Sequence, residues 1–382
     1  MTSKITNLKE EDGRTTFTIS NIDVSYVNAI RRTILSDIPI VVFKTTPYEE
    51  NNAVIMANTS RLNNEIIKQR LSCIPIHINY LNTDKDSIEN YLLELDVDNK
   101  TDTTMIVTTK DFKILNTLTN KYLDDGQVKR IFPPFIPPND SGEYYIDFVR
   151  LRPKLSEEIP GERIKLTCKF SVGTSRNDSM FNVTGTCSYG CTPDPEKIEE
   201  QLEIRKQKWK DEGKKEAEIK FEATNWKLLE GMRYIIKNSF DFVIESVGIY
   251  SNEQIIIEAC KILTRKLDEL KRLIESDDIE IKRSDNTLEN CYDVTLQNED
   301  YTIGNMLNFE LYKIFYNDFK VINYVGFKKI HPHDSDSLLR ISLEDITKGI
   351  STIKTMLIAV IDESMKTLQG VKGCFDGTRP DC

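Results

Sequence analysis

The feature that most constrains the fold of this chain is a pattern of secondary structure that occurs twice. The order strand, turn, strand, helix, strand is predicted for residues 5–45 and again for residues 279–327. In both segments, alternating apolar residues indicate half-buried strands, and apolar residues three and four positions apart indicate an amphipathic helix. Because an internal repeat indicates a repeated structural unit, we expect two domains of the same topology.

The helix of each segment carries an apolar stripe that needs a partner surface. The first helix is predicted over Val24–Ser36 and the second over Thr302–Tyr316. An apolar stripe left in water is unfavourable, so we expect the two helices to pack against each other. The residues expected at this contact are Ile34 and Leu35 from the first helix and Leu307 and Leu311 from the second.

The two segments differ in how many residues separate them from the fourth strand and the long helix that follow. The second is followed at once by a fourth strand and a long helix, so only 45 residues separate Asn305 from Ile350. In the first segment the corresponding strand and helix come much later, and 225 residues separate Asn28 from Glu253. The difference of about 180 residues is the size of a whole domain. The sequence therefore predicts a domain inserted after the third strand of the first segment.

These observations predict an α+β protein with three parts. The first half is discontinuous and comprises residues 1–46 and 225–275, the inserted β-rich domain comprises residues 47–224, and the second half comprises residues 276–382. Each half reads β-β-α-β-β-α and, at about 90 residues, would have a marginal core alone. We therefore expect the halves to form an intramolecular pseudo-dimer. The alternative is two unrelated α+β domains.

Composition narrows the possible functions. With 51 Lys and Arg against 61 Asp and Glu, the formal net charge is −10. Proteins that coat nucleic acid are normally basic, so we expect no direct sequence-specific DNA contact. No stretch approaches the 18 apolar residues that a membrane span needs, so no membrane partner is expected. The eight cysteines form no paired CxxC units, which is typical of reduced thiols in the cytosol or nucleus.

The sequence offers no convincing catalytic or metal-binding set. No Walker loop and no GxGxxG, GxSxG or HExxH motif occurs. His331 and His333 could share an ion, and Cys187 and Cys191 form a close pair, but neither set has the further ligands that zinc requires. The segment from Lys206 to Lys215 combines basic residues with Trp209, but neighbouring acidic residues balance it. We therefore predict no catalytic residue, no cofactor and no metal, and a solvated helix or connector in this segment.

Particular motifs resemble a known family. Asn28 to Leu35 (NAIRRTIL), followed by Asp37-Ile38-Pro39, is similar to a signature of the alpha-type assembly subunits of cellular RNA polymerases. That family includes bacterial alpha, archaeal D and the third-largest eukaryotic subunit. The segments NTSRL, QRL and IPI between Asn58 and Ile76 resemble its next motif, and Pro160 to Ile164 (PGERI) resembles a later strand. Glu245 to Gly248 and the following helix resemble its C-terminal part.

The C-terminal region resembles the smaller partner of the same family, archaeal L and the eleventh eukaryotic subunit. The carrying segments are Asn298 to Leu307 (NEDYTIGNML), Val325 to Lys329 (VGFKK), His331 to His333 and Leu339 to Ile341 (LRI). This double resemblance implies a fusion of two subunits that are usually separate chains, as in large cytoplasmic DNA viruses. The chain lacks the cysteine cluster of some relatives, since no cysteine lies between Cys73 and Cys168. A metal site in the inserted domain is therefore not expected.

The resemblance also suggests where a partner would bind. Arg31 and Arg32 lie in the middle of the first helix, next to its apolar stripe, and must face away from the core. In the family this pair, with the asparagine at position 28, lies near the contact with the second-largest subunit. We therefore expect Asn28, Arg31 and Arg32 to bind that subunit. The alternative is that these are ordinary surface arginines.

The function implied by the resemblance is that of a non-catalytic assembly subunit of a multisubunit DNA-directed RNA polymerase. Its partners would be the second-largest and largest subunits, together with small polymerase subunits, and no homodimer is expected. A viral subunit would act in the virion and the host cytoplasm, and any other in the nucleus. The rival interpretations are a free-standing nucleic-acid-binding protein and an enzyme with an unrecognised site in the inserted domain.

Overall fold

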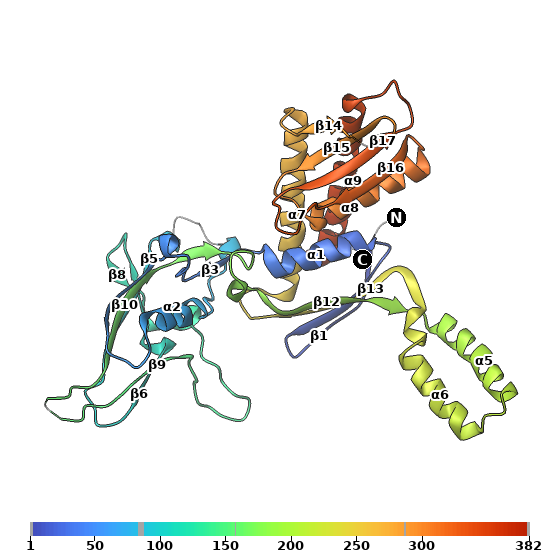
Figure 1. The fold of residues 1–382 in the computed structure, drawn as a ribbon. Helices are drawn as coiled ribbons and strands as arrows, with labels where there is room; N and C mark the ends of the chain where they lie inside the picture. The colour runs from blue at the N-terminus through green and yellow to red at the C-terminus, as the bar shows by residue number, and fades with distance from the viewer. Residues whose placement is uncertain (1–2, 83–87, 157, 286–287, 380–382) are drawn as a thin grey trace. The chain divides into compact units, whose positions relative to one another are not determined.

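A computed structural model describes residues 3–82, 88–156, 158–285 and 288–379 (Figure 1). The chain divides into two compact units. Unit 1 comprises Met1–Ile34, Thr184–Glu245 and Asn252–Cys382, and unit 2 comprises Leu35–Val183 and Ser246–Ser251. Both units are therefore discontinuous in sequence, and each is described by itself.

Unit 1 contains two four-stranded antiparallel sheets. The first has the order β1-β2-β13-β12 and the second the order β14-β15-β17-β16. The strands of the first are β1 (Lys4–Glu11), β2 (Arg14–Ser20), β12 (Thr184–Pro193) and β13 (Ile235–Ser246). Those of the second are β14 (Ile281–Arg283), β15 (Cys291–Leu296), β16 (Ile322–Lys328) and β17 (Ser337–Leu343). In both sheets the strand that precedes a long helix, β13 or β17, lies third.

Cross-strand pairs show why the register of the first sheet is specific. Phe17 on β2 lies opposite Phe242 on β13, and their rings stack with centroids 5.2 Å apart. One position away, on the other face, Thr18 donates a hydrogen bond to Asp241 at 2.8 Å. A shift of one residue would exchange the buried and polar faces, so the alternation fixes the pairing.

Four helices accompany these sheets in the order predicted from the sequence. They are α1 (Val24–Ser36), α7 (Asn252–Glu275), α8 (Tyr301–Leu311) and α9 (Ile350–Phe375). The predicted second helix, expected to run to Tyr316, ends as an α-helix at Leu311 and continues as a π-helical segment over Tyr312–Asp318. The long helix expected from Ile350 onward is α9 and runs to Phe375.

The long helices α7 and α9 pack against each other in antiparallel orientation. Lys271 on α7 forms an ion pair of 2.7 Å with Asp362 on α9. Farther along, Asp277, just after α7, pairs with Lys354 near the start of α9. Because the later residue of one helix meets the earlier residue of the other, the two helices run in opposite directions.

A helical hairpin lies between β12 and β13. It consists of α5 (Pro195–Asp211) and α6 (Glu216–Leu228), and its small core contains Leu202, Trp209 and Trp226. The segment from Lys206 to Lys215, expected to be a solvated helix or connector, forms the end of α5 and the turn before α6. Trp209 is 9% exposed and packs inside the hairpin, so it is not a platform for stacking bases.

Unit 2 is rich in short strands. Its five-stranded sheet has the order β4-β10-β5-β7-β8, and two-stranded sheets are formed by β3 with β11 and by β6 with β9. The strands are β3 (Ile40–Val42), β4 (Ala53–Asn58), β5 (Tyr91–Asp98), β6 (Met105–Thr108), β7 (Lys113–Asn116), β8 (Lys121–Tyr122), β9 (Asp147–Leu151), β10 (Arg163–Lys169) and β11 (Ser171–Gly173). Two short helices, α2 (Asn64–Ser72) and α4 (Asp125–Ile131), accompany them.

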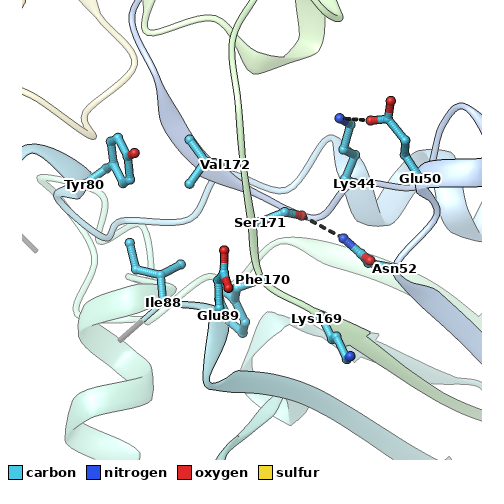
Figure 2. Close-up of a pocket in the computed structure, with 10 residues that line it drawn as sticks. All are labelled: Lys44, Glu50, Asn52, Tyr80, Ile88, Glu89, Lys169, Phe170, Ser171 and Val172. Carbon is cyan, nitrogen blue, oxygen red and sulfur yellow. Dashed lines mark hydrogen bonds and ion pairs between the residues drawn. The ribbon is translucent and has the colours of Figure 1, made fainter. Parts of the chain in front are cut away.

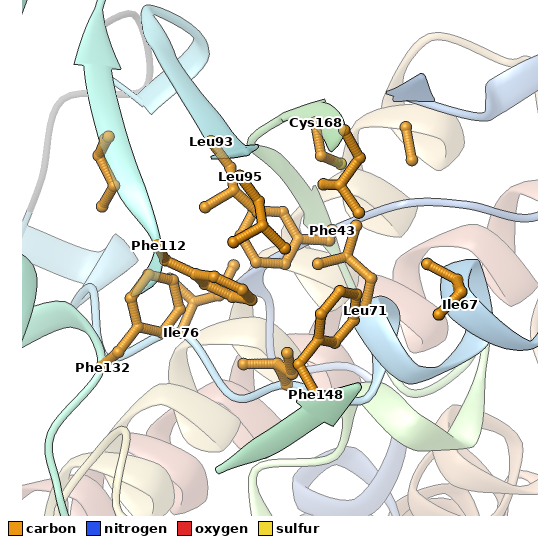
Figure 3. Close-up of a cluster of buried hydrophobic side chains, with 14 of the residues drawn as sticks. Phe43, Ile67, Leu71, Ile76, Leu93, Leu95, Phe112, Phe132, Phe148 and Cys168 are labelled. Atoms are coloured by element: carbon orange, nitrogen blue, oxygen red, sulfur yellow. The ribbon is translucent and has the colours of Figure 1, made fainter. Parts of the chain in front are cut away.

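Phenylalanine rings contact one another in the core of unit 2, among a larger number of aliphatic side chains (Figure 3). The Phe112 ring meets the rings of Phe132 and Phe148 edge to face, with centroids 5.3 and 5.6 Å apart. The ring centroids of Phe43 and Phe170 lie 4.9 Å apart. Edge-to-face pairs add to the free energy gained by burying aromatic surface. Unit 2 therefore has a hydrophobic core of its own.

The boundaries of unit 2 differ from those expected for the inserted domain. The strand expected to complete the first sheet, at residues 40–45, instead pairs as β3 with β11 inside unit 2. The edge position of the first sheet is taken by β12, which the sequence boundaries had placed within the insertion. Hydrogen-bond pairing, which sequence periodicity does not reveal, thus places Leu35–Val183 in unit 2 and β12 in unit 1.

The segment Pro160 to Glu162, just before β10, is held by backbone contact. Asn99 donates its backbone N–H to the Glu162 carbonyl, and the buried Glu162 carboxylate accepts the backbone N–H of Arg152. A Cβ added to Gly161 would lie only 1.7 Å from the Asn99 carbonyl oxygen. Only glycine fits a position where backbones approach this closely.

We therefore expect Gly161→Ala to lower the free energy of unfolding by about 1–3 kcal/mol, as overpacking typically does. Gly190→Ala is the matched control, because a Cβ added at Gly190 has no neighbour within 4 Å. Urea unfolding followed by circular dichroism measures both. Equal stability of the two variants would show that the backbone contact at Gly161 adjusts without cost.

Candidate functional site

Helix α1 has an apolar face and a polar face. Within unit 1, side chains of α1 form hydrogen bonds to α8, to the N-cap residue of α8 and to α9. Its buried residues are Tyr26, Val27, Ala29, Ile30, Thr33 and Ile34. The side chains of Asn28, Arg31 and Arg32, which the sequence singled out, are all half-buried. The helix therefore holds its charged residues beside, and not within, its apolar face.

Arg32 is used inside the chain. Its Nε donates to the Thr302 hydroxyl at 2.9 Å, and its Nη2 donates to Asp300 at 2.7 Å. Asp300 is the N-cap of α8, where its carboxylate also accepts the backbone N–H of Thr302 at 2.8 Å. The guanidinium thus binds the start of α8 through charge-assisted hydrogen bonds, which are stronger than neutral ones.

The electrostatics of Asp300 follow from these contacts. Burial by itself would raise the pKa of Asp300, but the hydrogen bonds from Thr302 and the charge of Arg32 outweigh it and lower the pKa to about 2. The carboxylate is therefore charged throughout the physiological pH range. The ion pair remains about one third exposed on the arginine side, so water screens part of its strength.

A second contact between α1 and α8 is fully buried. The Tyr26 hydroxyl lies 2.8 Å from a carboxylate oxygen of Glu310 and 3.0 Å from the Ser364 hydroxyl oxygen on α9. Burial, and then the charge of Glu310, raise the pKa of Tyr26 well above its usual value. The phenol therefore stays protonated and donates to the carboxylate. The ring of Phe309 packs edge-on against Tyr26.

Sequence reasoning missed this contact. Glu310 is 1% exposed, and its second oxygen pairs with the half-exposed Lys313 at 3.1 Å. A buried charge is costly unless it is paired and hydrogen-bonded, so Tyr26 and Lys313 are needed to keep Glu310 in place. The available signal was an acidic residue between Leu307 and Leu311, inside the apolar stripe of the predicted helix.

Arg31 is placed differently from Arg32. Its Nε and Nη2 both donate to the side-chain oxygen of Asn28, one turn earlier on the same helix, at 3.1 and 3.0 Å. Its partner is a neutral residue, so the guanidinium keeps its full charge for another group. Of the two adjacent arginines, Arg31 is therefore the one that is not committed to α8.

The residues predicted at the helix contact have different positions. Ile34, Leu307 and Leu311 are buried in unit 1, at 1%, 0% and 0% exposure. Leu35 is half-buried and is the first residue of unit 2. Among the described residues, the contacts that join α1 to α8 within unit 1 include the polar ones of Arg32 and Tyr26 and the edge-to-face ring pair of Tyr26 with Phe309.

The candidate metal ligands do not converge. Within residues 3–82, 88–156, 158–285 and 288–379, no group of three or more His, Cys, Asp or Glu side chains could hold a metal ion. His331 accepts the backbone N–H of His333 through its ring, which fits a structural turn. Burial raises the pKa of Cys168, Cys187 and Cys260 to about 12, so these thiols are protonated and unreactive.

The part of the chain that the structure describes also holds no helix with the length and apolarity needed to span a bilayer.

Unit 2 contains a cavity of about 590 Å³ (Figure 2), which is a candidate for the enzyme site of the rival interpretation. Among its lining residues, Lys44 pairs with Glu50, and Asn52 donates to the Ser171 hydroxyl at 3.1 Å. Ser171 also lies 3.4 Å from the Val42 carbonyl oxygen, to which its hydroxyl donates. An amide and a backbone carbonyl cannot take a proton from serine, so these contacts do not activate a nucleophile.

Comparison with known proteins adds an independent line of argument. The sequence profile described as "RNA polymerase Rpb3/Rpb11 dimerisation domain" matches residues 16–267. The chain is 25% identical over 299 residues to "DNA-directed RNA polymerases I and III subunit RPAC1" of Saccharomyces cerevisiae, a match that covers 69% of this chain and 86% of that protein.

Two further relatives match shorter stretches. "DNA-directed RNA polymerase subunit Rpo3" of Pyrococcus horikoshii is 34% identical over 93 residues, which is 24% of this chain and 31% of that protein. "DNA-directed RNA polymerases IV and V subunit 3B" of Arabidopsis thaliana is 37% identical over 75 residues, which is 20% of this chain and 21% of that protein. All three relatives are named as subunits of DNA-directed RNA polymerases.

The buried tyrosine gives a prediction about stability. Tyr26→Phe removes the donor to Glu310 and leaves a buried carboxylate oxygen without that partner, which typically costs about 1–3 kcal/mol. Tyr312→Phe is the control, because the Tyr312 side chain is exposed and stacks on Tyr316. We expect chemical unfolding to show the loss only for Tyr26→Phe. A loss of similar size in both variants would contradict a special role of the Glu310 contact.

The Arg32–Asp300 pair gives a prediction about pH. A carboxyl group with a lowered folded-state pKa stabilises the fold above its unfolded pKa of about 3.9, and this contribution is lost as the pH falls toward 2. We therefore expect Arg32→Met to cost up to about 1 kcal/mol at pH 6 and less at pH 3. Arg31→Met is the control, because its partner Asn28 does not titrate.

Unfolding free energies of the wild type and both variants, measured from pH 6 to pH 3, check this. A cost of Arg32→Met that does not change with pH would mean that the hydrogen bond to Thr302, and not the charge of Asp300, carries the contact.

Proposed function

The chain belongs to the RNA polymerase Rpb3/Rpb11 dimerisation domain family, and from this membership we infer that it is a non-catalytic assembly subunit of a multisubunit DNA-directed RNA polymerase. The observation that carries the inference is the extent of the match, which begins in β2 and ends within α7. It therefore includes the helix that bears Asn28, Arg31 and Arg32. A relative of which 86% is covered is itself named as a polymerase subunit.

The finer proposal is that the chain contains two halves of the same topology, fused end to end. Two sheets with equivalent strand orders support it, since each places the strand before its long helix in the third position. The antiparallel packing of α7 on α9 and the polar contacts from α1 to α8 support it further. In this proposal β1, β2, α1, β12, β13 and α7 form one half, and unit 2 is the inserted domain.

The fusion has a physical advantage. Only residues 276–280 connect the end of α7 to the start of β14. A short tether makes the pairing of two halves intramolecular, with an effective concentration of the order of millimolar. The two halves would then pair without depending on the concentration of separate subunits, and the subunit would not form a homodimer.

We place the binding surface for the large subunits on α1. Arg31 is favoured because its guanidinium donates to a neutral asparagine of its own helix, whereas Arg32 is committed to Asp300. The planar guanidinium can form two parallel bonds with a carboxylate or with backbone carbonyl groups. Asn28 holds it in place from one turn away. The second-largest subunit would dock here, and the largest and small subunits would join the same platform.

The site of action follows from the polymerase that contains the subunit. If the polymerase belongs to a large cytoplasmic DNA virus, the subunit acts in the virion and the host cytoplasm. The resemblance to fused subunits of such viruses supports this setting. A cellular polymerase of a eukaryote would place it in the nucleus.

Affinity purification of a tagged copy from cells that contain its native polymerase tests the assembly function. We expect the two large polymerase subunits to co-purify in stoichiometric amounts. In the same experiment, Arg31→Ala should weaken recruitment of the second-largest subunit, because losing a buried interface arginine typically costs about 2–5 kcal/mol of association. Arg205→Ala, an exposed helical arginine on α5, is the matched control.

The two parts of this experiment can fail separately. A chain that purifies without large subunits would contradict the assembly function. Unchanged recruitment by Arg31→Ala, with the large subunits present, would show only that the docking surface lies elsewhere.

A further inference from the structure

A groove of about 720 Å³ runs between α7 and α9 in unit 1. Four of its lining residues are cationic: Lys261 and Arg265 from α7, and Lys366 and Lys372 from α9. One lining residue, Asp362, is acidic, and its carboxylate is bound by Lys271. The groove is thus basic although the whole chain carries a net charge of −10.

The acidic partner that two of these cations share is withdrawn from the surface. Glu258 pairs with both Lys261 and Arg265, yet its side chain is 7% exposed while theirs are 48% and 62% exposed. Lys366 is 74% exposed and lies 3.5 Å from Glu363, which is 43% exposed, and Lys372 lies 3.5 Å from Asp376. The positive groups therefore face the solvent, and the carboxylate that balances two of them lies beneath. Such a rim attracts an acidic partner.

The floor of the groove is apolar. It contains Met365, which is half-buried, and Leu368, which is fully buried, between the rows of cations. The lining runs along α9 from Asp362 to Lys372, and ten residues of helix span about 15 Å. Methionine adapts its shape to different apolar partners. A groove of this length, with Met365 and Leu368 in its floor, suits three turns of a helix that packs across the two existing ones.

We propose that this groove binds an acidic amphipathic helix of a partner protein. Apolar residues at positions i, i+3 or i+4, and i+7 would occupy the floor, and flanking Asp or Glu residues would meet the basic rim. The apolar floor favours a protein helix over nucleic acid, whose backbone would place phosphates along the whole groove. The proposal does not depend on the assembly function proposed above.

A synthetic helix tests the proposal with the full chain. The probe is a fluorescent 16-residue peptide with leucines at helical spacing and flanking glutamates. A second peptide has lysine in place of each glutamate, and a third has a central proline that breaks the helix. We expect the acidic peptide to bind with a micromolar dissociation constant and the other two to bind at least about tenfold more weakly. Binding of the acidic peptide should weaken with added salt.

A charge-reversed variant locates the site. Lys366→Glu combined with Gln369→Glu changes the rim without touching Arg265, whose loss would leave the buried Glu258 with one partner fewer. We expect this variant to bind the acidic peptide about tenfold more weakly and the lysine peptide more tightly than the wild type does. Lys208→Glu, on the exposed surface of α5, is the control and should change neither affinity by more than about twofold.

Three outcomes would overturn the proposal. The first is failure of the acidic peptide to bind to the wild type. The second is equal binding to the wild type and the charge-reversed variant, provided that thermal unfolding shows both to be folded. The third is tighter binding of a 20-nucleotide single strand or a duplex than of the acidic peptide, with loss of that binding in the variant, which would make the groove a nucleic-acid site.

Discussion

The packing of α7 against α9 is the contact on which the rest of unit 1 depends. Each four-stranded sheet has one long helix whose apolar residues recur every three to four positions, and those residues are buried. A sheet with its own helices alone would leave much of this surface in water, and a domain of that size has a marginal core. Burying the two helices on each other removes apolar surface from both at once, which is the dominant favourable contribution to folding.

Polar contacts then select one arrangement of the helices. Apolar packing tolerates small shifts, whereas a buried carboxylate has to meet its partners with good geometry. Glu310 requires Tyr26 and Lys313 at defined positions, and Asp300 requires Arg32 at the start of α8. Tyr26 and Glu310 lie 284 residues apart in the sequence, and Arg32 and Asp300 lie 268 residues apart. Their contribution lies in specifying the pairing of α1 with α8 as much as in adding stability.

The same helix carries two arginines with different roles because adjacent positions on a helix point in different directions. Arg32 points to the cap of α8, and Arg31 points back to Asn28. One arginine therefore binds the start of α8, and the other binds a residue of its own helix. The two side chains are chemically identical, so the difference arises from their positions. Neighbouring residues on an α-helix point about 100° apart around the helix axis.

The sequence by itself determined the local elements and the family. Alternating residues gave β2, β13, β15 and β17, and helical spacing gave α1, α7, α8 and α9, because both patterns report which side of an element is buried. The motif around Asn28 indicated a polymerase subunit, and the profile match to residues 16–267, which includes this motif, confirmed the family. Tertiary structure alone decided the pairing. It paired β3 (residues 40–42) with β11 and placed β12 at the edge of the first sheet. It also brought the Glu310 carboxylate to the Tyr26 hydroxyl. Periodicity shows which face of an element is apolar, but strand partners and buried ion pairs depend on residues that are distant in sequence, and one sequence does not record those contacts.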